Sequence, residues 1–91
     1  MKYMEFRWNE WNMEHATRHG VSVEEIEWLI ETAEPPFPEY RGDGKWLVQG
    51  RGKSGRYVQA IYLVDDDGPI FVIHARTLDN QEIRRYRRRL R

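Results

Sequence analysis

Residues 45–76 read KWLVQGRGKSGRYVQAIYLVDDDGPIFVIHAR, and this stretch decides the fold. Its runs 45–50, 57–64 and 70–76 are mostly apolar, with many β-branched and aromatic side chains, and glycine-containing segments separate them. Such runs favour β-strands, and such short segments favour hairpin turns. The stretch therefore predicts a three-stranded antiparallel meander. Residues 70–73 are apolar on both faces, as in a central, covered strand.

Parity within the third run indicates where its polar side chains point. Successive side chains of a strand project to opposite faces of the sheet. His74 and Arg76 are therefore expected to project together at the end of this strand. The two expected faces are Ile70, Val72, His74 and Arg76 on one side, and Phe71, Ile73 and Ala75 on the other.

Signals for three helices flank the meander. Each helix is expected to follow a residue whose side chain can cap free backbone N–H groups. Gly20 and the pair Pro35-Pro36 are expected to end the first two helices. The expected helices follow the caps Asn9, Ser22 and Asp79, and end near His19, Ala33 and Leu90.

Two further segments complete the predicted architecture. Residues 3–8 alternate loosely and predict an N-terminal strand, whereas the proline-containing residues 34–44 predict an irregular connection. The whole is an α+β fold, in which a mainly antiparallel sheet packs with two N-terminal helices and one C-terminal helix. The length of 91 residues suits a single domain spanning residues 1–91.

Composition excludes several classes of protein. The chain has no cysteine, which excludes disulfide scaffolds, thiolate metal sites and cysteine nucleophiles. No apolar run approaches the roughly 20 residues of a membrane span. The first five residues, MKYME, lack the apolar region of a secretory signal. We therefore expect a cytoplasmic protein without membrane contact.

The charges are unevenly distributed along a chain of zero net charge. Residues 1–45 carry five Lys and Arg against ten Asp and Glu, and residues 46–91 carry ten against five. Six of the last eight residues are arginine, which suits bidentate phosphate binding. This run favours either a surface for a polyanion such as RNA or a solvated helix face.

Familiar catalytic motifs are absent from the sequence. Residues 50–55, GRGKSG, lack the spacing of a phosphate-binding loop, and neither HExxH nor a nucleophile elbow occurs. His15 and His19 have the i, i+4 spacing of metal ligands, although an exposed polar helix face explains them better. We expect neither a metal nor a cofactor.

Arginines and a few proton-transferring side chains form the remaining chemical set. RNA can be cleaved without metal when the 2′-OH attacks phosphorus, cations stabilise the transition state, and a base and an acid move protons. The cations are Arg51, Arg56 and Arg76, and the proton-transferring candidates are His19, His74 and Tyr86. The set is compatible with this reaction without proving it.

Four segments in order resemble the BrnT family of toxins from bacterial type II toxin–antitoxin systems. The segments are FRWN at 6–9, RHGVSVEE at 18–25, GR at 50–51 with GR at 55–56, and IHAR at 73–76 followed by Glu82 and Tyr86. The resemblance implies a RelE-like fold and RNA cleavage that inhibits translation. It also implies neutralisation by a BrnA-type ribbon-helix-helix antitoxin, through which alone the toxin would contact DNA.

The resemblance also implies roles for individual residues. Arg51 and Arg76 are expected to bind phosphate and stabilise the transition state, and Arg56 to make a weaker phosphate contact. His19, Glu25, His74 and Tyr86 complete the catalytic candidates, although His19, Glu25 and Tyr86 have structural interpretations as helix-end, capping and buried residues. Further candidates for RNA contact are Lys53, Arg84 and Arg88.

Two positions depart from the family pattern. His74 stands where a small serine is usual, and Thr17 stands where a basic residue is common. His74 either adds an acid–base group or marks divergence. A second interpretation therefore stays open, in which the chain is a non-catalytic module that binds an antitoxin-type partner and acts in operon regulation.

Overall fold

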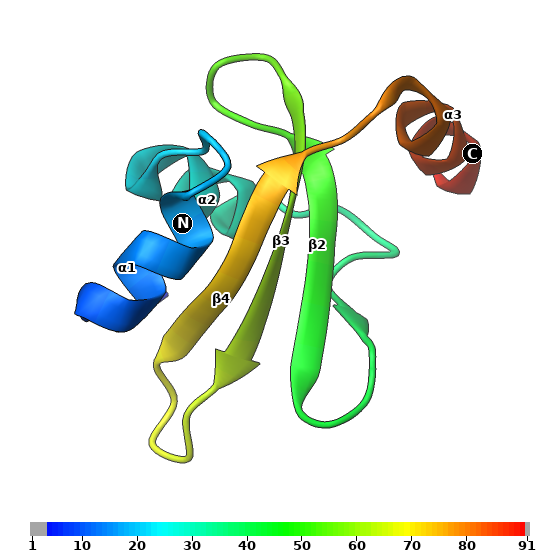
Figure 1. Cartoon of the computed structure of the whole chain (residues 1–91). Coiled ribbons are helices and arrows are strands. Elements are labelled where there is room, and N and C mark those ends of the chain that lie inside the picture. The colour runs from blue at the N-terminus through cyan, green and yellow to red at the C-terminus, as the bar shows by residue number, and fades with distance from the viewer. Residues whose placement is uncertain (1–3, 91) are drawn as a thin grey trace.

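A computed structural model describes residues 4–90 as three helices and a four-stranded sheet (Figure 1). The predicted α+β class is confirmed, and each predicted helix and each strand of the meander forms within a few residues of its expected bounds. The elements in chain order are α1 (Glu10–Thr17), α2 (Val23–Glu31), β1 (Glu39–Tyr40), β2 (Lys45–Arg51), β3 (Tyr57–Val64), β4 (Ile70–Thr77) and α3 (Asn80–Arg89).

The sheet is antiparallel and curved, with the strand order β1-β2-β3-β4. Residues 45–51 of β2 pair continuously with residues 57–63 of β3, so that Gln49 lies opposite Gln59. On the other side of β3, Gln59 lies opposite Arg76 of β4. The register therefore brings two glutamines and one arginine into a row across three strands.

The fourth strand is not the N-terminal one that the sequence predicts. Phe6 makes only an isolated parallel bridge to Ile70, because the chain turns into α1 a few residues later and α1 lies beside β4 (Figure 1). Residue 3, where the expected strand begins, lies outside the described residues. The fourth strand is β1, which forms within the expected irregular connection and pairs with Leu47 and Trp46.

A β-bulge changes the predicted faces of β4. Ile61 pairs with His74 but Tyr62 pairs with Val72, so Ile73 is an extra residue in β4. An extra residue reverses the side-chain alternation beyond it. His74 and Arg76 therefore share a face as predicted, but it is opposite to the face of Ile70 and Val72, so that part of the prediction is wrong.

The hydrophobic core lies between one face of the sheet and the helices α1 and α2. Val48, Val58, Ala60, Val72 and Ala75 project from the strands into this core. The helices contribute fully buried residues at helical spacing, so that each presents one apolar side to the sheet. These helix residues are Ala16, Ile26, Leu29 and Ile30.

Helix α3 stands apart from the other helices, on the opposite side of the molecule in Figure 1. Its one buried residue, Tyr86, stacks on Phe37 of the proline-containing connection and meets Tyr57 of β3 edge to face. Arg89 forms an ion pair with Glu39 of β1. The proline-containing connection therefore packs against α3, which explains why Phe37 is buried although its neighbours are exposed.

Side chains cap all three helices as the sequence predicts. Ser22 and Asp79 accept hydrogen bonds from the third residue of their helices. Asn9 and Asn12 cap each other reciprocally, with the Asn9 N–H 2.7 Å from Asn12 Oδ1. Asn12 is fully buried and also donates to the Arg7 carbonyl at 3.0 Å, so it joins the N-terminal segment to α1.

No helix within residues 4–90 is both long enough and apolar enough to cross a membrane.

We predict that Asn12→Ala lowers the free energy of unfolding by about 2 kcal/mol, because the buried cap and the bond to the Arg7 carbonyl are lost together. Urea unfolding followed by circular dichroism measures this change. Asn80→Ala is the matched control, because Asn80 is exposed at the start of α3 and should change stability by less than about 0.5 kcal/mol. Equal losses in the two variants would contradict the structural role of Asn12.

Candidate functional site

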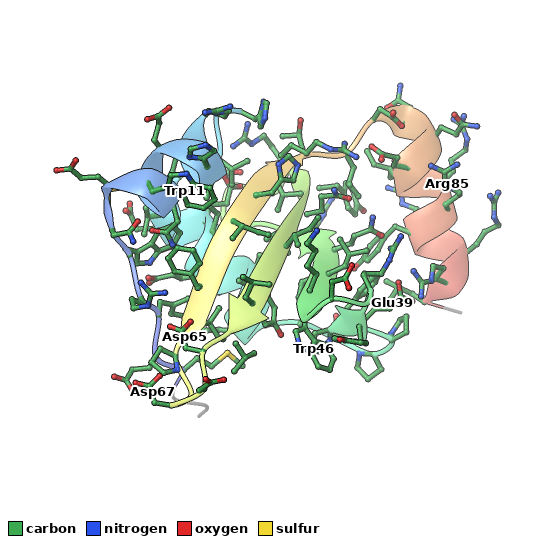
Figure 2. The ribbon with its side chains drawn as sticks, turned by 60° about the horizontal axis from the view of Figure 1, so that its bottom comes forward. Trp11, Glu39, Trp46, Asp65, Asp67 and Arg85 are labelled. Atoms are coloured by element: carbon green, nitrogen blue, oxygen red, sulfur yellow. The ribbon has the colours of Figure 1, made fainter. Side chains whose placement is uncertain are left out.

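A groove lies on the sheet face that α1 and α2 leave uncovered, between the strands and α3. We call it the glutamine groove, and its volume is about 540 Å³. In Figure 2, α3 with Arg85 stands beyond the β2 side of the sheet, and Trp11 of α1 lies beyond the β4 side. Ten residues line the groove: Arg41, Lys45, Leu47, Gln49, Gln59, Ile61, Arg76, Glu82, Arg85 and Arg89.

The lining of the glutamine groove is basic around a polar floor. Five of its ten residues are arginine or lysine and one is acidic. On the floor, the Gln49 amide donates to Gln59 Oε1 at 3.0 Å. Because each amide carries both donors and acceptors, this single bond leaves hydrogen-bonding capacity on both side chains.

Arg76 crosses from the end of β4 to the start of α3. Its guanidinium donates two hydrogen bonds to Glu82, at 2.8 and 2.7 Å, and a third to the Thr77 carbonyl at 3.1 Å. The bond from Arg76, aided by a backbone bond from Asp79, lowers the pKa of Glu82 from 4.5 to about 2. The Arg76 side chain is still 36% exposed, so the groove contains a guanidinium of fixed orientation.

His74 and His19 meet beside Arg76. Their rings contact edge to face with centroids 5.5 Å apart, although one comes from β4 and the other from the turn after α1. Burial, and then the charges of His19 and Arg76, lower the pKa of His74. His74 is therefore predominantly neutral at pH 7, which suits an imidazole that accepts a proton.

A second groove, of about 500 Å³, opens between α2, the Gln49–Arg51 end of β2 and the other side of α3. We call it the tyrosine groove. Helix α3 lies between the two grooves, since Glu82, Arg85 and Arg89 face the first groove and Tyr86, Arg87 and Leu90 face the second, and the grooves adjoin at Gln49, which lines both. Its remaining lining is Leu29, Thr32, Ala33, Glu34, Gln49, Gly50, Arg51 and Tyr57.

Two arginines flank one tyrosine in the tyrosine groove. The guanidinium carbons of Arg51 and Arg87 lie 5.2 and 5.3 Å from the centre of the Tyr57 ring. Arg87 also donates to the Tyr57 hydroxyl at 3.1 Å. This hydrogen bond and the two positive charges lower the pKa of Tyr57.

Tyr86 faces the same groove in a different environment. Burial, followed by the influence of Glu34 and Tyr57, raises the pKa of Tyr86. The two rings lie 5.8 Å apart, so the groove holds neighbouring phenols whose pKa values are displaced in opposite directions. In such a pair, the phenol with the lowered pKa suits a general base and the phenol with the raised pKa suits a general acid.

Glu25 and Arg56 join the β2–β3 hairpin loop to α2. Arg56 donates to Glu25 Oε1 at 2.7 Å and to the Gly20 carbonyl at 3.1 Å, and Ser54 donates to the same carboxylate. Burial alone would raise the pKa of Glu25, but the bonds from Ser54 and Arg56 lower it below its usual value. Glu25 and Arg56 therefore act as a structural clamp away from both grooves.

The other three predicted RNA-contact residues, like Arg56, lie outside the two grooves. Lys53 is exposed at the tip of the hairpin loop, beside Glu24 and Ser54. Arg84 and Arg88 are exposed on α3 but line neither groove. The α3 arginines that do line a groove are Arg85, Arg87 and Arg89, which the sequence alone does not distinguish from their neighbours.

The structure thus divides the predicted catalytic residues into three places. Arg51 and Tyr86 meet in the tyrosine groove, Arg76 lies in the glutamine groove with His74 and His19 beside it, and Glu25 lies in the clamp. Sequence reasoning missed Tyr57, Gln49 and Gln59. Polar glutamines in otherwise apolar strands, placed opposite each other by the hairpin register, were the available signal.

Within residues 4–90 no three or more His, Asp or Glu side chains are grouped so that they could hold a metal ion.

Comparison with known proteins identifies no relative of this chain: no family model, no curated protein and no solved structure matches it.

We predict that Gly52→Ala lowers the free energy of unfolding by about 1–3 kcal/mol, because a Cβ at this position would lie 2.8 Å from Glu25 Cγ and 2.9 Å from Cδ. Thermal unfolding of the variant measures the loss. The control repeats the substitution in a Glu25→Ala background, where the clashing atoms are absent. A similar loss in both backgrounds would show that the clamp does not require glycine.

We predict that Glu82→Gln destabilises the fold by about 2 kcal/mol at pH 7. The depression of the Glu82 pKa corresponds to more than this, at about 1.4 kcal/mol per pKa unit, but solvent around the partly exposed Arg76 screens the pair and reduces the effect. The folded-state pKa is depressed, so this stabilisation is present above pH 4.5 and is lost as the pH falls toward 2. Urea unfolding between pH 2 and 7 tests this, and the variant should show a flatter profile than the wild type. Parallel profiles would contradict the pairing.

Proposed function

We propose that the chain is a RelE-like ribonuclease toxin of a type II toxin–antitoxin system, which cleaves RNA without a metal and thereby inhibits translation. A cytoplasmic location follows from an RNA target. The observation that supports this proposal best is the tyrosine groove, where two guanidiniums flank one phenol and a second phenol lies alongside. These groups match the cations, base and acid that transesterification of RNA requires.

Each group in the tyrosine groove has a role in the proposed reaction. Tyr57, as phenolate, takes the proton of a ribose 2′-OH, whose oxygen then attacks the adjacent phosphorus. The bond from phosphorus to the 5′-oxygen breaks, and Tyr86 protonates that oxygen. The products are a 2′,3′-cyclic phosphate and a 5′-OH end. Arg51 and Arg87 stabilise the extra negative charge on the phosphoryl oxygens in the transition state.

The proposed partners follow from the same function. An antitoxin of the BrnA type, with a ribbon-helix-helix DNA-binding part, neutralises the toxin and carries the complex to operator DNA. An acidic antitoxin segment would be attracted to the arginines of α3, of which Arg85 and Arg89 line the glutamine groove and Arg87 lines the tyrosine groove. The toxin itself then contacts RNA and the antitoxin, and reaches DNA only through the antitoxin.

A second candidate function is a non-catalytic module that binds an antitoxin-type partner and regulates its operon. The arginine pairing favours this alternative: Arg56, Arg76 and Arg89 each bind a carboxylate of the same chain. Guanidiniums with such partners stabilise structure without needing a substrate. Tight complex formation combined with intact RNA would establish this function in place of the first.

We predict that Tyr57→Phe lowers the rate of RNA cleavage by about 100-fold or more, because it removes the proposed base without removing the ring. The assay incubates purified protein with a single-stranded RNA in EDTA and maps the ends. Wild-type cleavage should increase with pH until Tyr57 is ionised, below its ordinary pKa of 10.0, whereas the variant should lose this dependence.

Two controls make the assay decisive. Tyr40→Phe alters an exposed tyrosine outside both grooves and should keep full activity. A substrate with a single 2′-deoxy nucleotide at the mapped position should resist cleavage there, because the attacking hydroxyl is missing. Full activity of Tyr57→Phe would refute the assignment of the base, and no cleavage by the wild-type protein, together with no growth arrest on its expression, would refute the ribonuclease function.

A further inference from the structure

The glutamine groove has features that the proposed cleavage reaction does not use. Gln59 is only 8% exposed, yet its side chain is directed away from the helix-covered core toward the uncovered face, where it pairs with Gln49. Among the described residues no buried side-chain nitrogen or oxygen lacks a hydrogen-bond partner, so the polar atoms of the two amides that do not bond each other are accessible from the groove. A ligand in the groove can therefore use the donors and acceptors that the single bond between the two amides leaves free.

The surroundings of the two amides indicate the class of ligand. Leu47 and Ile61 flank the amides on the same face and offer an apolar surface, while Arg76 lies opposite Gln59 on the neighbouring strand. A guanidinium plane of fixed orientation is a stacking surface for a nucleobase. Apolar contact, stacking and paired donors and acceptors together suit the flat polar edge of a base.

The rim of the glutamine groove suits the phosphates that accompany a base. Lys45 and Arg85 line it and form no ion pair with any residue that the structure describes. Positive charge beside surfaces on which bases stack is the arrangement by which single-strand-binding proteins bind a nucleic-acid backbone. The groove is also larger than the lower limit of about 300 Å³ for ligand sites.

We propose that the glutamine groove is a base-reading subsite for single-stranded nucleic acid, in which Gln49 and Gln59 hydrogen-bond the edge of one nucleobase and Lys45 and Arg85 bind the flanking phosphates. Adenine is the preferred base, because a glutamine amide places an acceptor beside a donor and adenine presents the complement at N7 and N6. The subsite selects which nucleotide lies next to the scissile bond, so it rests on the proposed ribonuclease function.

The binding experiment separates this subsite from catalysis. Fluorescence anisotropy measures the affinity of the full chain for ten-nucleotide oligo(dA), oligo(dC) and oligo(dT), which have no 2′-OH and cannot be cleaved by the proposed reaction. Wild-type protein should bind oligo(dA) about tenfold more tightly than oligo(dT). The double variant Gln49→Leu/Gln59→Leu should bind all three oligonucleotides with equal affinity, since it keeps the side-chain volume but loses the amides.

A matched variant and a competitor complete the test. Gln81→Leu changes an exposed glutamine of α3 that does not line the groove, and it should keep the wild-type base preference. Unfolding curves confirm that the double variant is folded, and a folded single variant Gln49→Leu replaces it if it is not. Polyglutamate should show the same inhibition constant against the wild type and against the double variant, because it can engage only the cations.

The outcomes distinguish the subsite from the enzyme. Base preference in the wild type that disappears in the glutamine variant supports the subsite, even if no RNA is ever cleaved. Equal binding of all bases by the wild type, or an unchanged preference in the glutamine variant, overturns it. Polyglutamate binding that weakens with the glutamine substitutions would also overturn it, because it would identify the groove as a site for an acidic protein segment.

Discussion

The bidentate ion pair between Arg76 and Glu82 is the interaction on which the rest of the candidate site depends. It joins the end of β4 to the first turn of α3. The Glu82 carboxylate also accepts a hydrogen bond from the backbone N–H of Asp79, the residue that caps α3. The direction in which α3 leaves the sheet follows from these bonds. Because α3 forms a wall of both grooves, a shift of its first turn would change the shape of each groove.

The same helix explains how a chain of zero net charge can offer a basic surface. Acidic residues of the first half hold specific basic residues of the second half, as Glu25 holds Arg56 and Glu39 holds Arg89. Arg76 pairs with Glu82 of its own half. Arg51, Arg85 and Arg87 form no ion pair with any described residue, and they face the two grooves. These ion pairs therefore stabilise contacts between distant segments, and they determine which arginines stay available to a ligand.

The fold was predictable wherever local signals were strong. Turn glycines separate the strands of the meander, and Ser22 and Asp79 cap helices just as their side chains lead one to expect. The predicted N-terminal strand was wrong because the segment bonds only to Ile70 of β4 before the chain turns into α1, and alternation along the sequence cannot reveal how short that pairing is. The predicted faces of β4 were wrong beyond Ile73. The bulge there arises from the pairing of β4 with β3, which cannot be read from the sequence of β4 alone.

The sequence by itself determined the α+β class, the order of its main elements and the concentration of arginine in its second half, because periodicity, capping and charge are local properties. Only the tertiary structure decided which of these residues meet. It placed Arg51 with Tyr86 in one groove and Arg76 in another, and it brought Gln49 and Gln59 together on a strand face. The physical reason is that strand register and helix docking arise from contacts between distant segments, which no single stretch of sequence specifies.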